Sequence, residues 1–298
     1  RWGEDGIFAL CDREQRLCFA PTFWNGADPI LKERFFGLTG PQGNHGEDVK
    51  EEYWYLEAAP TASWLRALYR YPQRAFPYDR LVAENARRGP LDPEYELRDT
   101  GIFAEDRCFE IEVAYAKVSP DDILIRITAK NCGPDQAPLW ILPTLWFRNR
   151  WTWDPARPKA SGLGTSSTAL LTAQDESLGA WLLEGPTPGE ILFTENETNN
   201  TLLFGTPDAS PFTKDAFHRH LVGGEKGAVN PAKVGTKAAA VYHFNLAPGT
   251  SATLEMRLRS ARATSRVDFR QVMATRSREC AEYYDTIAAP SLDPAKRQ

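Results

Sequence analysis

The sequence has no apolar run that approaches the ~20 residues of a membrane-spanning helix, and it shows no secretory signal peptide. It also has no block of Lys and Arg, because its 35 basic residues are interspersed with 40 acidic ones, for a net charge of −5. This balance argues against an electrostatic surface for nucleic acid or for a membrane. A neutral or weakly polar ligand fits the charge better.

Cysteines are few, odd in number and without C-x-x-C spacing; they are Cys11, Cys18, Cys108, Cys132 and Cys280. This pattern argues against a disulfide framework and against a zinc site. The first three lie in alternating apolar runs, where a reduced cysteine behaves as a small hydrophobic residue. We therefore expect a reducing compartment and a cytoplasmic location.

Signatures of catalysis are also missing. The sequence contains no Ser-centred nucleophile elbow and no phosphate-binding loop. Glycoside hydrolysis needs two opposed carboxyl groups, and none of the 40 acidic residues belongs to a pair with a local signature. His218 and His220 could chelate a metal, but a solvated loop explains them better. We expect no catalytic residue, no metal and no cofactor in this chain.

Most of the chain alternates apolar and polar residues with the period of a β-strand. The pattern predicts a hairpin over 6–24, strands over 51–59, 168–174, 179–184, 190–195 and 201–205, an antiparallel meander between Tyr95 and Trp151, and a last strand pair over 237–246 and 251–260. Residues 63–71 fit an extended or a short helical piece. Helices are predicted over 78–88, near 214–221 and over 267–288.

A dozen or more strands with few helices favour two large antiparallel sheets packed face to face. We assign residues 1–266 to this all-β sandwich and residues 267–298 to a C-terminal linker helix. The chain begins at Arg1 without Met and ends just after the predicted helix. Both ends therefore suggest a fragment of a longer protein.

The segment from Trp24 to Glu51 is long, charged and rich in glycine. Glycines at 37, 40, 43 and 46 permit tight turns that would gather polar side chains able to bind hydroxyl groups. The candidate residues of this substrate-adjacent loop are Asn44, His45, Glu47, Asp48 and Lys50. A salt-bridged loop that joins two strands is the alternative interpretation.

A second patch follows a buried strand that begins at Trp140. Its residues are Trp146, Arg148, Arg150, Trp151 and Trp153. A cluster this apolar, next to a Pro-rich break, fits either a seam of the core or a surface for another domain. We favour a docking surface.

Several runs together resemble the N-terminal region of bacterial glycoside hydrolase family 63 proteins, which are related to mannosyl-oligosaccharide glucosidase. The runs are Arg1-Trp-Gly-Glu-Asp-Gly, residues 24–51, Asp99-Thr-Gly-Ile-Phe, Pro120-Asp-Asp-Ile-Leu-Ile-Arg-Ile-Thr and Leu142-Pro-Thr-Leu-Trp-Phe-Arg-Asn. The resemblance implies a galactose-mutarotase-like super-β-sandwich that precedes an (α/α)6 barrel. It also implies inverting hydrolysis of α-glucosides in that barrel.

Because the family's acid and base belong to the barrel, the resemblance assigns this chain a non-catalytic role. The implied partners are the C-terminal barrel of the same protein and an oligosaccharide or small glucoside. Two alternatives stay open. The supply of nine Trp, ten Tyr and fifteen Phe suits a free-standing sugar-binding module, although most of these rings would serve the core. A mutarotase-like epimerase would need a Glu and a His in one groove, and Glu47 with His45 is the close pair.

Overall fold

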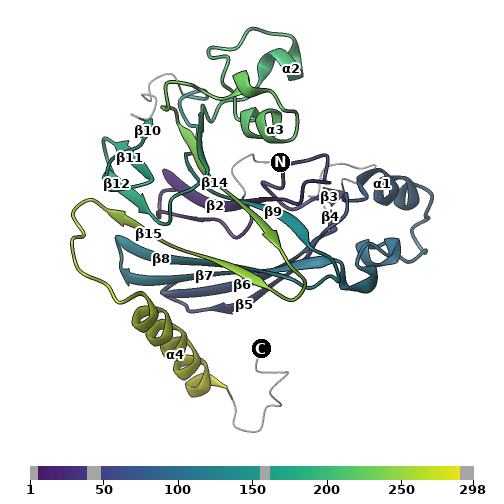
Figure 1. The fold of residues 1–298 in the computed structure, drawn as a ribbon, viewed down its shortest axis with the longest axis horizontal. Coiled ribbons are helices and arrows are strands. Elements are labelled where there is room, and N and C mark those ends of the chain that lie inside the picture. Colours follow the sequence, from purple (N-terminus) through teal and green to yellow (C-terminus); the bar gives the residue numbers. More distant parts are fainter. Residues whose placement is uncertain (1–5, 39–47, 155–161, 289–298) are drawn as a thin grey trace.

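The computed structural model describes residues 6–38, 48–154 and 162–288 (Figure 1). These residues form two large antiparallel sheets, one of five strands and one of eight, with few helices. The two sheets pack face to face, as Figure 1 shows. The predicted all-β sandwich is confirmed.

The smaller sheet has the strand order β1-β2-β9-β14-β13. Its strands are β1 (Leu10–Cys11), β2 (Leu17–Trp24), β9 (Ala137–Phe147), β14 (Lys237–Leu246) and β13 (Glu190–Thr194). The larger sheet has the order β10-β11-β12-β15-β8-β7-β6-β5. Its strands are β10 (Gly162–Gly164), β11 (Leu171–Asp175), β12 (Gly179–Glu184), β15 (Ser251–Ser260), β8 (Asp122–Asn131), β7 (Cys108–Ser119), β6 (Trp64–Pro72) and β5 (Glu52–Ala58). A separate pair joins β3 (Gly37–Leu38) to β4 (Asp48–Val49).

The alternation of β7 shows why these sequences form strands. Phe109, Ile111 and Val113 are fully buried between the sheets. On the opposite face, Glu110 and Glu112 form ion pairs with arginines of the neighbouring β6. Each inward side chain gains free energy from the removal of apolar area from water, and the outward ones stay hydrated.

The last helix, α4 (Phe269–Ile287), packs on the outer face of the larger sheet (Figure 1). The side chain of Asp268 caps its first turn by accepting from the amide of Gln271 at 3.0 Å. Small side chains at Ala114 and Ala116 of β7 leave room for Met273 of the helix. The helix predicted over 267–288 is present and is docked on the sandwich, and the barrel expected after it stays a prediction.

The remaining helices are short. They are α1 (Tyr78–Ala86), α2 (Asn200–Phe204), α3 (Ala216–Leu221), η1 (Leu97–Thr100), η2 (Ala104–Asp106) and η3 (Lys226–Ala228). The strand predicted over 201–205 is wrong, because these residues form α2. The side chain of Asn199 accepts from the amide of Leu202 at 2.9 Å, and Gly205 ends the helix at a φ of 66°. Both are ordinary helix-end signals.

Two predicted strand pairings are also wrong. The third strand of the expected meander, β9, lies in the other sheet between β2 and β14. The expected final pair is split as well, because β14 joins the smaller sheet and β15 the larger one. The two connections that cross between the sheets, from β8 to β9 and from β14 to β15, both pass the fully buried Asn131. Its side-chain amide donates to the carbonyls of Asp135 and Leu246 at 2.7 and 2.8 Å. These bonds hold both connections at the end of the sandwich.

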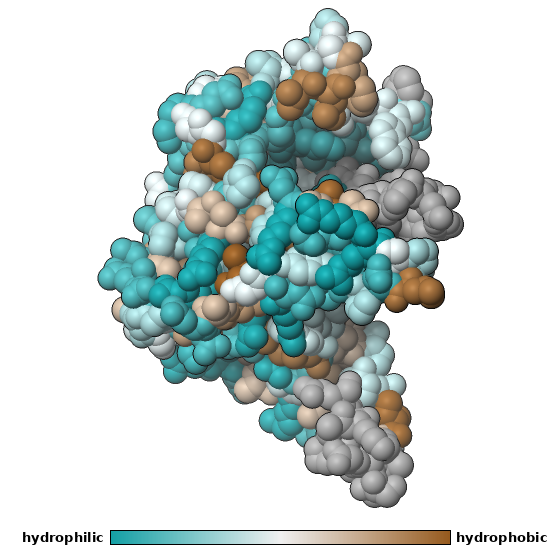
Figure 2. All heavy atoms as spheres, turned by 90° about the vertical axis from the view of Figure 1, so that its right-hand side faces the viewer, coloured by the Kyte–Doolittle hydropathy of each residue, from teal (hydrophilic) through white to brown (hydrophobic). Residues whose placement is uncertain are grey.

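The described residues on the face shown in Figure 2 are mainly hydrophilic, with apolar residues in small patches. One patch lies at the top of that view, over α2, where Leu202, Leu203 and Phe204 are exposed. Among the described residues, no helix combines the length and the apolar character that crossing a bilayer requires.

Candidate functional site

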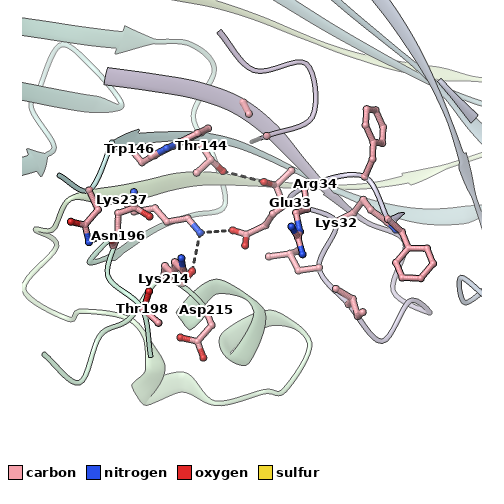
Figure 3. A pocket seen from close by; sticks show the side chains of 18 of the residues that line it. Lys32, Glu33, Arg34, Thr144, Trp146, Asn196, Thr198, Lys214, Asp215 and Lys237 are labelled. Atoms are coloured by element: carbon pink, nitrogen blue, oxygen red, sulfur yellow. Dashed lines mark hydrogen bonds and ion pairs between the residues drawn. The ribbon is translucent and has the colours of Figure 1, made fainter. Parts of the chain in front are cut away.

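A pocket of about 930 Å³ lies on the outer face of the smaller sheet (Figure 3). Strand alternation places Thr22 of β2, Thr144 and Trp146 of β9, and Lys237 of β14 side by side on that face. The chain after β2, residues 30–37, forms one wall. The opposite wall includes Asn149, Trp153, Asn196, Thr198, Lys214 and Asp215.

An ion pair lies in the pocket. Lys237 Nζ donates to Glu33 Oε1 at 2.5 Å and to the carbonyl of Lys214 at 2.9 Å (Figure 3). Lys237 is buried, and its ammonium group lies 4.8 Å from the ring centroid of Phe217. Through these two contacts Lys237 joins the two walls across the floor of the pocket.

A buried polar network lies behind the wall that carries Lys32 and Tyr78. Lys32 Nζ donates to Glu51 Oε1 and to the Tyr78 hydroxyl, both at 2.7 Å. The Tyr78 hydroxyl in turn donates to Asp28 Oδ2 at 3.3 Å, and Lys32 Nζ lies 4.0 Å from the same oxygen. Burial raises the pKa of Asp28 above its ordinary value, although nearby Lys32 opposes the shift.

Asp215 is the second acidic residue of the pocket and lies at the start of α3. Burial works against its ionisation, but hydrogen bonds from Thr213 and Asn199, at 2.5 and 3.0 Å, outweigh burial and lower the pKa of Asp215. Its carboxyl group is therefore ionised at neutral pH. Of the described residues that line the pocket, Glu33 and Asp215 are the acidic ones.

The pocket offers aromatic rings and amides close to the charges. Trp146 is buried in its floor, whereas Trp153 is 81% exposed at its edge. The side chain of Asn149 donates to the carbonyl of Asn196, and that of Asn196 to the carbonyl of Phe147, both at 2.9 Å. Such a surface can stack on the apolar face of a ring and exchange hydrogen bonds with hydroxyl groups.

The substrate-adjacent loop predicted from the sequence falls largely outside the described residues, which applies to Asn44, His45 and Glu47. The backbone of Asp48 begins β4. Lys50 is buried and forms ion pairs with Glu94 and Glu96 at 2.5 and 3.2 Å. These ion pairs join Lys50 to the segment between α1 and η1, and both interpretations of the loop stay predictions.

The predicted docking residues lie around the end of β9. Trp146 and Trp153 line the pocket. Trp151 Nε1 donates to Glu197 Oε1 at 2.9 Å, Arg148 donates to the side chain of Gln15, and Arg150 is half-buried. The structure thus brings two of the three tryptophans of this patch, Trp146 and Trp153, to one cavity.

Sequence reasoning missed most of the pocket. Glu33 lies inside the segment 24–51 that it singled out, but Lys237, Asn196, Lys214 and Asp215 carried no local signal. One weak sequence signal for the pocket lies in β2, where the polar Thr22 interrupts an apolar run. A polar residue at this position indicates that one face of the strand does not pack into the hydrophobic core.

No family model matches the sequence. The chain is 41% identical over 290 residues to the uncharacterized protein YMR196W of Saccharomyces cerevisiae, a match that covers 85% of this chain and 27% of that protein. The chain therefore spans about a quarter of that relative's length. Among solved structures, a polysaccharide lyase matches with a TM-score of 0.35 at 11% identity. This match covers 88% of this chain and 28% of the lyase chain. A putative aldose 1-epimerase from Escherichia coli K12 matches with a TM-score of 0.33 at 12% identity. This match covers 81% of this chain and 82% of the epimerase chain.

Proposed function

We propose that this chain is the non-catalytic β-sandwich domain of a larger glycoside hydrolase resembling family 63, an α-glucosidase, and that its pocket binds part of the saccharide. The observation that carries the proposal is the lining of the pocket over the smaller sheet. It combines tryptophans with threonine, asparagine and paired charges. A neutral, ring-shaped and hydroxyl-rich ligand matches these groups.

The two acidic residues of the pocket support a binding role rather than hydrolysis. A glycosidase needs one carboxyl group that stays protonated to act as the acid. The pKa of Asp215 is lowered, so this residue cannot supply the proton at neutral pH. Glu33 accepts from the ammonium group of Lys237 at 2.5 Å, so its carboxyl group is already engaged in an ion pair.

The mutarotase-like alternative stays a prediction. That chemistry needs an acid and a base in one groove, and the sequence pointed to Glu47 with His45, which lie outside the described residues. Of the other histidines, His218 accepts from the amide of Leu31, His220 contacts Glu190, and His243 stacks on Trp140. None of these three lines the pocket.

The domain role rests on the sequence resemblance and on surface features. The yeast relative is nearly four times as long as the matched region, which covers 27% of it. Exposed Leu202, Leu203 and Phe204 of α2, together with Trp153, offer apolar area that a catalytic barrel of the same protein would cover. Their positions near the pocket would let the barrel and the pocket share one saccharide.

Titration calorimetry with maltose-type and mannose-containing oligosaccharides tests the proposal. We expect millimolar binding, and a loss of about tenfold or more in Trp153→Ala because a stacked ring is removed. Trp153 is so exposed that its truncation should change the free energy of unfolding by less than about 0.5 kcal/mol. Trp54→Ala, at an exposed tryptophan of β5 in the other sheet, serves as the matched control and should bind normally.

Absence of binding by the wild-type chain at millimolar saccharide would reject the binding role. The non-catalytic assignment is tested separately with an aryl α-glucoside. Turnover by residues 1–298 at a rate typical of a complete glucosidase would refute that assignment even if the saccharide binds.

A further inference from the structure

Two cysteines face each other across the first hairpin of the sandwich. Cys11 of β1 and Cys18 of β2 are direct partners in the antiparallel register. The amide of Asp12 donates to the carbonyl of Leu17, so the adjacent Cys11–Cys18 pair occupies a non-hydrogen-bonded position. Cα atoms at such positions lie about 4.5 Å apart, which is within the range of about 4.4–6.8 Å that disulfides span.

The turn that joins the two strands is held rigidly. The Asp12 carboxylate accepts from the amides of Glu14, Arg16 and Leu17 at 3.0, 2.6 and 2.9 Å. It also accepts from Arg16 Nε at 3.0 Å. Because these bonds fix the turn, the two thiols are already held opposite each other, and a bond between them would order little more of the chain.

The environment of the pair suits thiol chemistry. Cys11 is exposed on the edge strand of the smaller sheet, whereas Cys18 is buried against Ala20 and Trp146. A hydrogen bond with the Cys18 thiol lowers the pKa of Cys11 to about 7, with a further contribution from Arg148, against the opposing effects of burial and Asp12. A large share of Cys11 is thus the reactive thiolate at neutral pH.

We propose that Cys11 and Cys18 form a reversible disulfide when the protein meets a peroxide, which makes the first hairpin a site of oxidative modification. The Cys11 thiolate attacks one peroxide oxygen, the O–O bond breaks, and Cys11 becomes a sulfenic acid as hydroxide leaves and is protonated to water. Cys18, after losing its proton, then attacks the Cys11 sulfur and displaces a second hydroxide, which takes up that proton. Two thiols and one peroxide thus give one disulfide and two waters, and a small thiol reductant reverses the change.

The chain contains an internal comparison. Cys108, the first residue of β7, and Cys132, the residue that follows β8, are also neighbours, because the amide of Cys132 donates to the carbonyl of Cys108 at 3.0 Å. Burial raises the pKa of Cys108 to about 12, and the pKa of Cys132 is also raised by burial. This second pair should therefore stay reduced under conditions that oxidise the first, since the thiolate is the reacting form.

Trypsin and mass spectrometry can separate the two pairs, because Arg and Lys residues place all four cysteines on different peptides. After treatment of the whole chain with hydrogen peroxide at pH 7 and alkylation, we expect peptides 2–13 and 17–32 to be linked. The link between peptides 108–117 and 131–148 should form at least about tenfold more slowly. Cys132→Ser should leave the first link unchanged, and Cys11→Ser or Cys18→Ser should abolish it.

A second measurement does not depend on variants that might fold poorly. Alkylation of Cys11 in the wild-type chain should rise with a midpoint near pH 7, with Asp12, Arg148 and Cys18 as the neighbouring groups that set it. The proposal is overturned if the first pair stays unlinked in peroxide, if both pairs link at equal rates, or if Cys11 is oxidised without joining Cys18.

Discussion

Lys237 and Glu33 lie 204 positions apart in the sequence, yet the Lys237 ammonium group donates to the Glu33 carboxylate at 2.5 Å. The contact joins the first residue of β14 to the segment that follows β2. Lys237 is almost fully buried, while the Glu33 side chain is 34% exposed. The pair therefore fixes one wall of the pocket to its floor.

Replacement of Lys237 by Met tests this role. The change leaves Glu33 without its cation and the carbonyl of Lys214 without a donor, so we expect the free energy of unfolding to fall by about 1–3 kcal/mol. Urea unfolding followed by far-ultraviolet circular dichroism measures it. Arg87→Met, in an exposed pair with Glu84 on α1, is the control and should cost less than about 0.5 kcal/mol. Equal losses in the two variants would contradict a structural role for the pocket pair.

The raised pKa of Asp28 gives a pH dependence of definite sign. In the unfolded chain Asp28 titrates near its ordinary value of 3.8, and in the folded chain at a higher pH. Between these two values the folded state binds more protons, so this residue adds stability as the pH falls. The difference between the unfolding free energies of wild type and Asp28→Asn should therefore increase as the pH is lowered from 7 to 4. Urea unfolding at several pH values measures this difference.

Asp12 provides a control of opposite sign. Burial works against its ionisation, but bonds from the amides of Leu17 and Glu14 and from Arg16 outweigh it and lower the pKa of Asp12. The unfolded state then binds more protons as the pH falls, so wild type should lose stability relative to Asp12→Asn below about pH 4. The same sign for both variants would show that one of the two assignments is wrong.

Gly235 tests the backbone beside the pocket. A Cβ atom there would overlap the carbonyl oxygen of Thr194, which also accepts from the amide of Thr236 at 3.0 Å. Gly235→Ala should lower the free energy of unfolding by about 1–3 kcal/mol. The reason is that β13 and the segment that leads into β14 must move apart to make room for the added methyl group. Gly227→Ala, where a Cβ meets nothing within 4 Å, should change it by less than about 0.5 kcal/mol. Thermal unfolding of both variants measures these changes. An unchanged midpoint for Gly235→Ala would refute the close approach of Gly235 to the Thr194 carbonyl.

Local pattern predicted the strands well where one face is buried and the other is hydrated. The bounds expected for β14 and β15 agree with the structure, because Pro248 and Gly249 mark the turn, and β15 and the last part of β14 alternate between buried and more exposed residues. The same approach failed at α2, where Leu202, Leu203 and Phe204 look like a strand by composition. Asn199 and Gly205 hold the segment as a helix there, so capping outweighed apolar content.

The pocket could not be predicted as a set. Its residues come from several strands of the smaller sheet and from segments far apart in the sequence, and no single one of them carries a local signature of a site. Composition directed attention to segment 24–51 and to the end of β9, and the resemblance to family 63 includes runs from both. Both segments contribute to the pocket through Glu33, Trp146 and Trp153, but the polar candidates chosen within the first segment were different ones.

The sequence by itself determined which residues of each strand face inward, because the hydrophobic effect acts on every side chain separately and leaves a two-residue period that can be read locally. Only the tertiary structure decided which strands are neighbours. Pairing depends on hydrogen bonds and packing between distant segments, such as the connections held at Asn131 that send β9 and β15 to different sheets. The outer face of the smaller sheet, and with it the contact between Lys237 and Glu33, follows from that non-local choice.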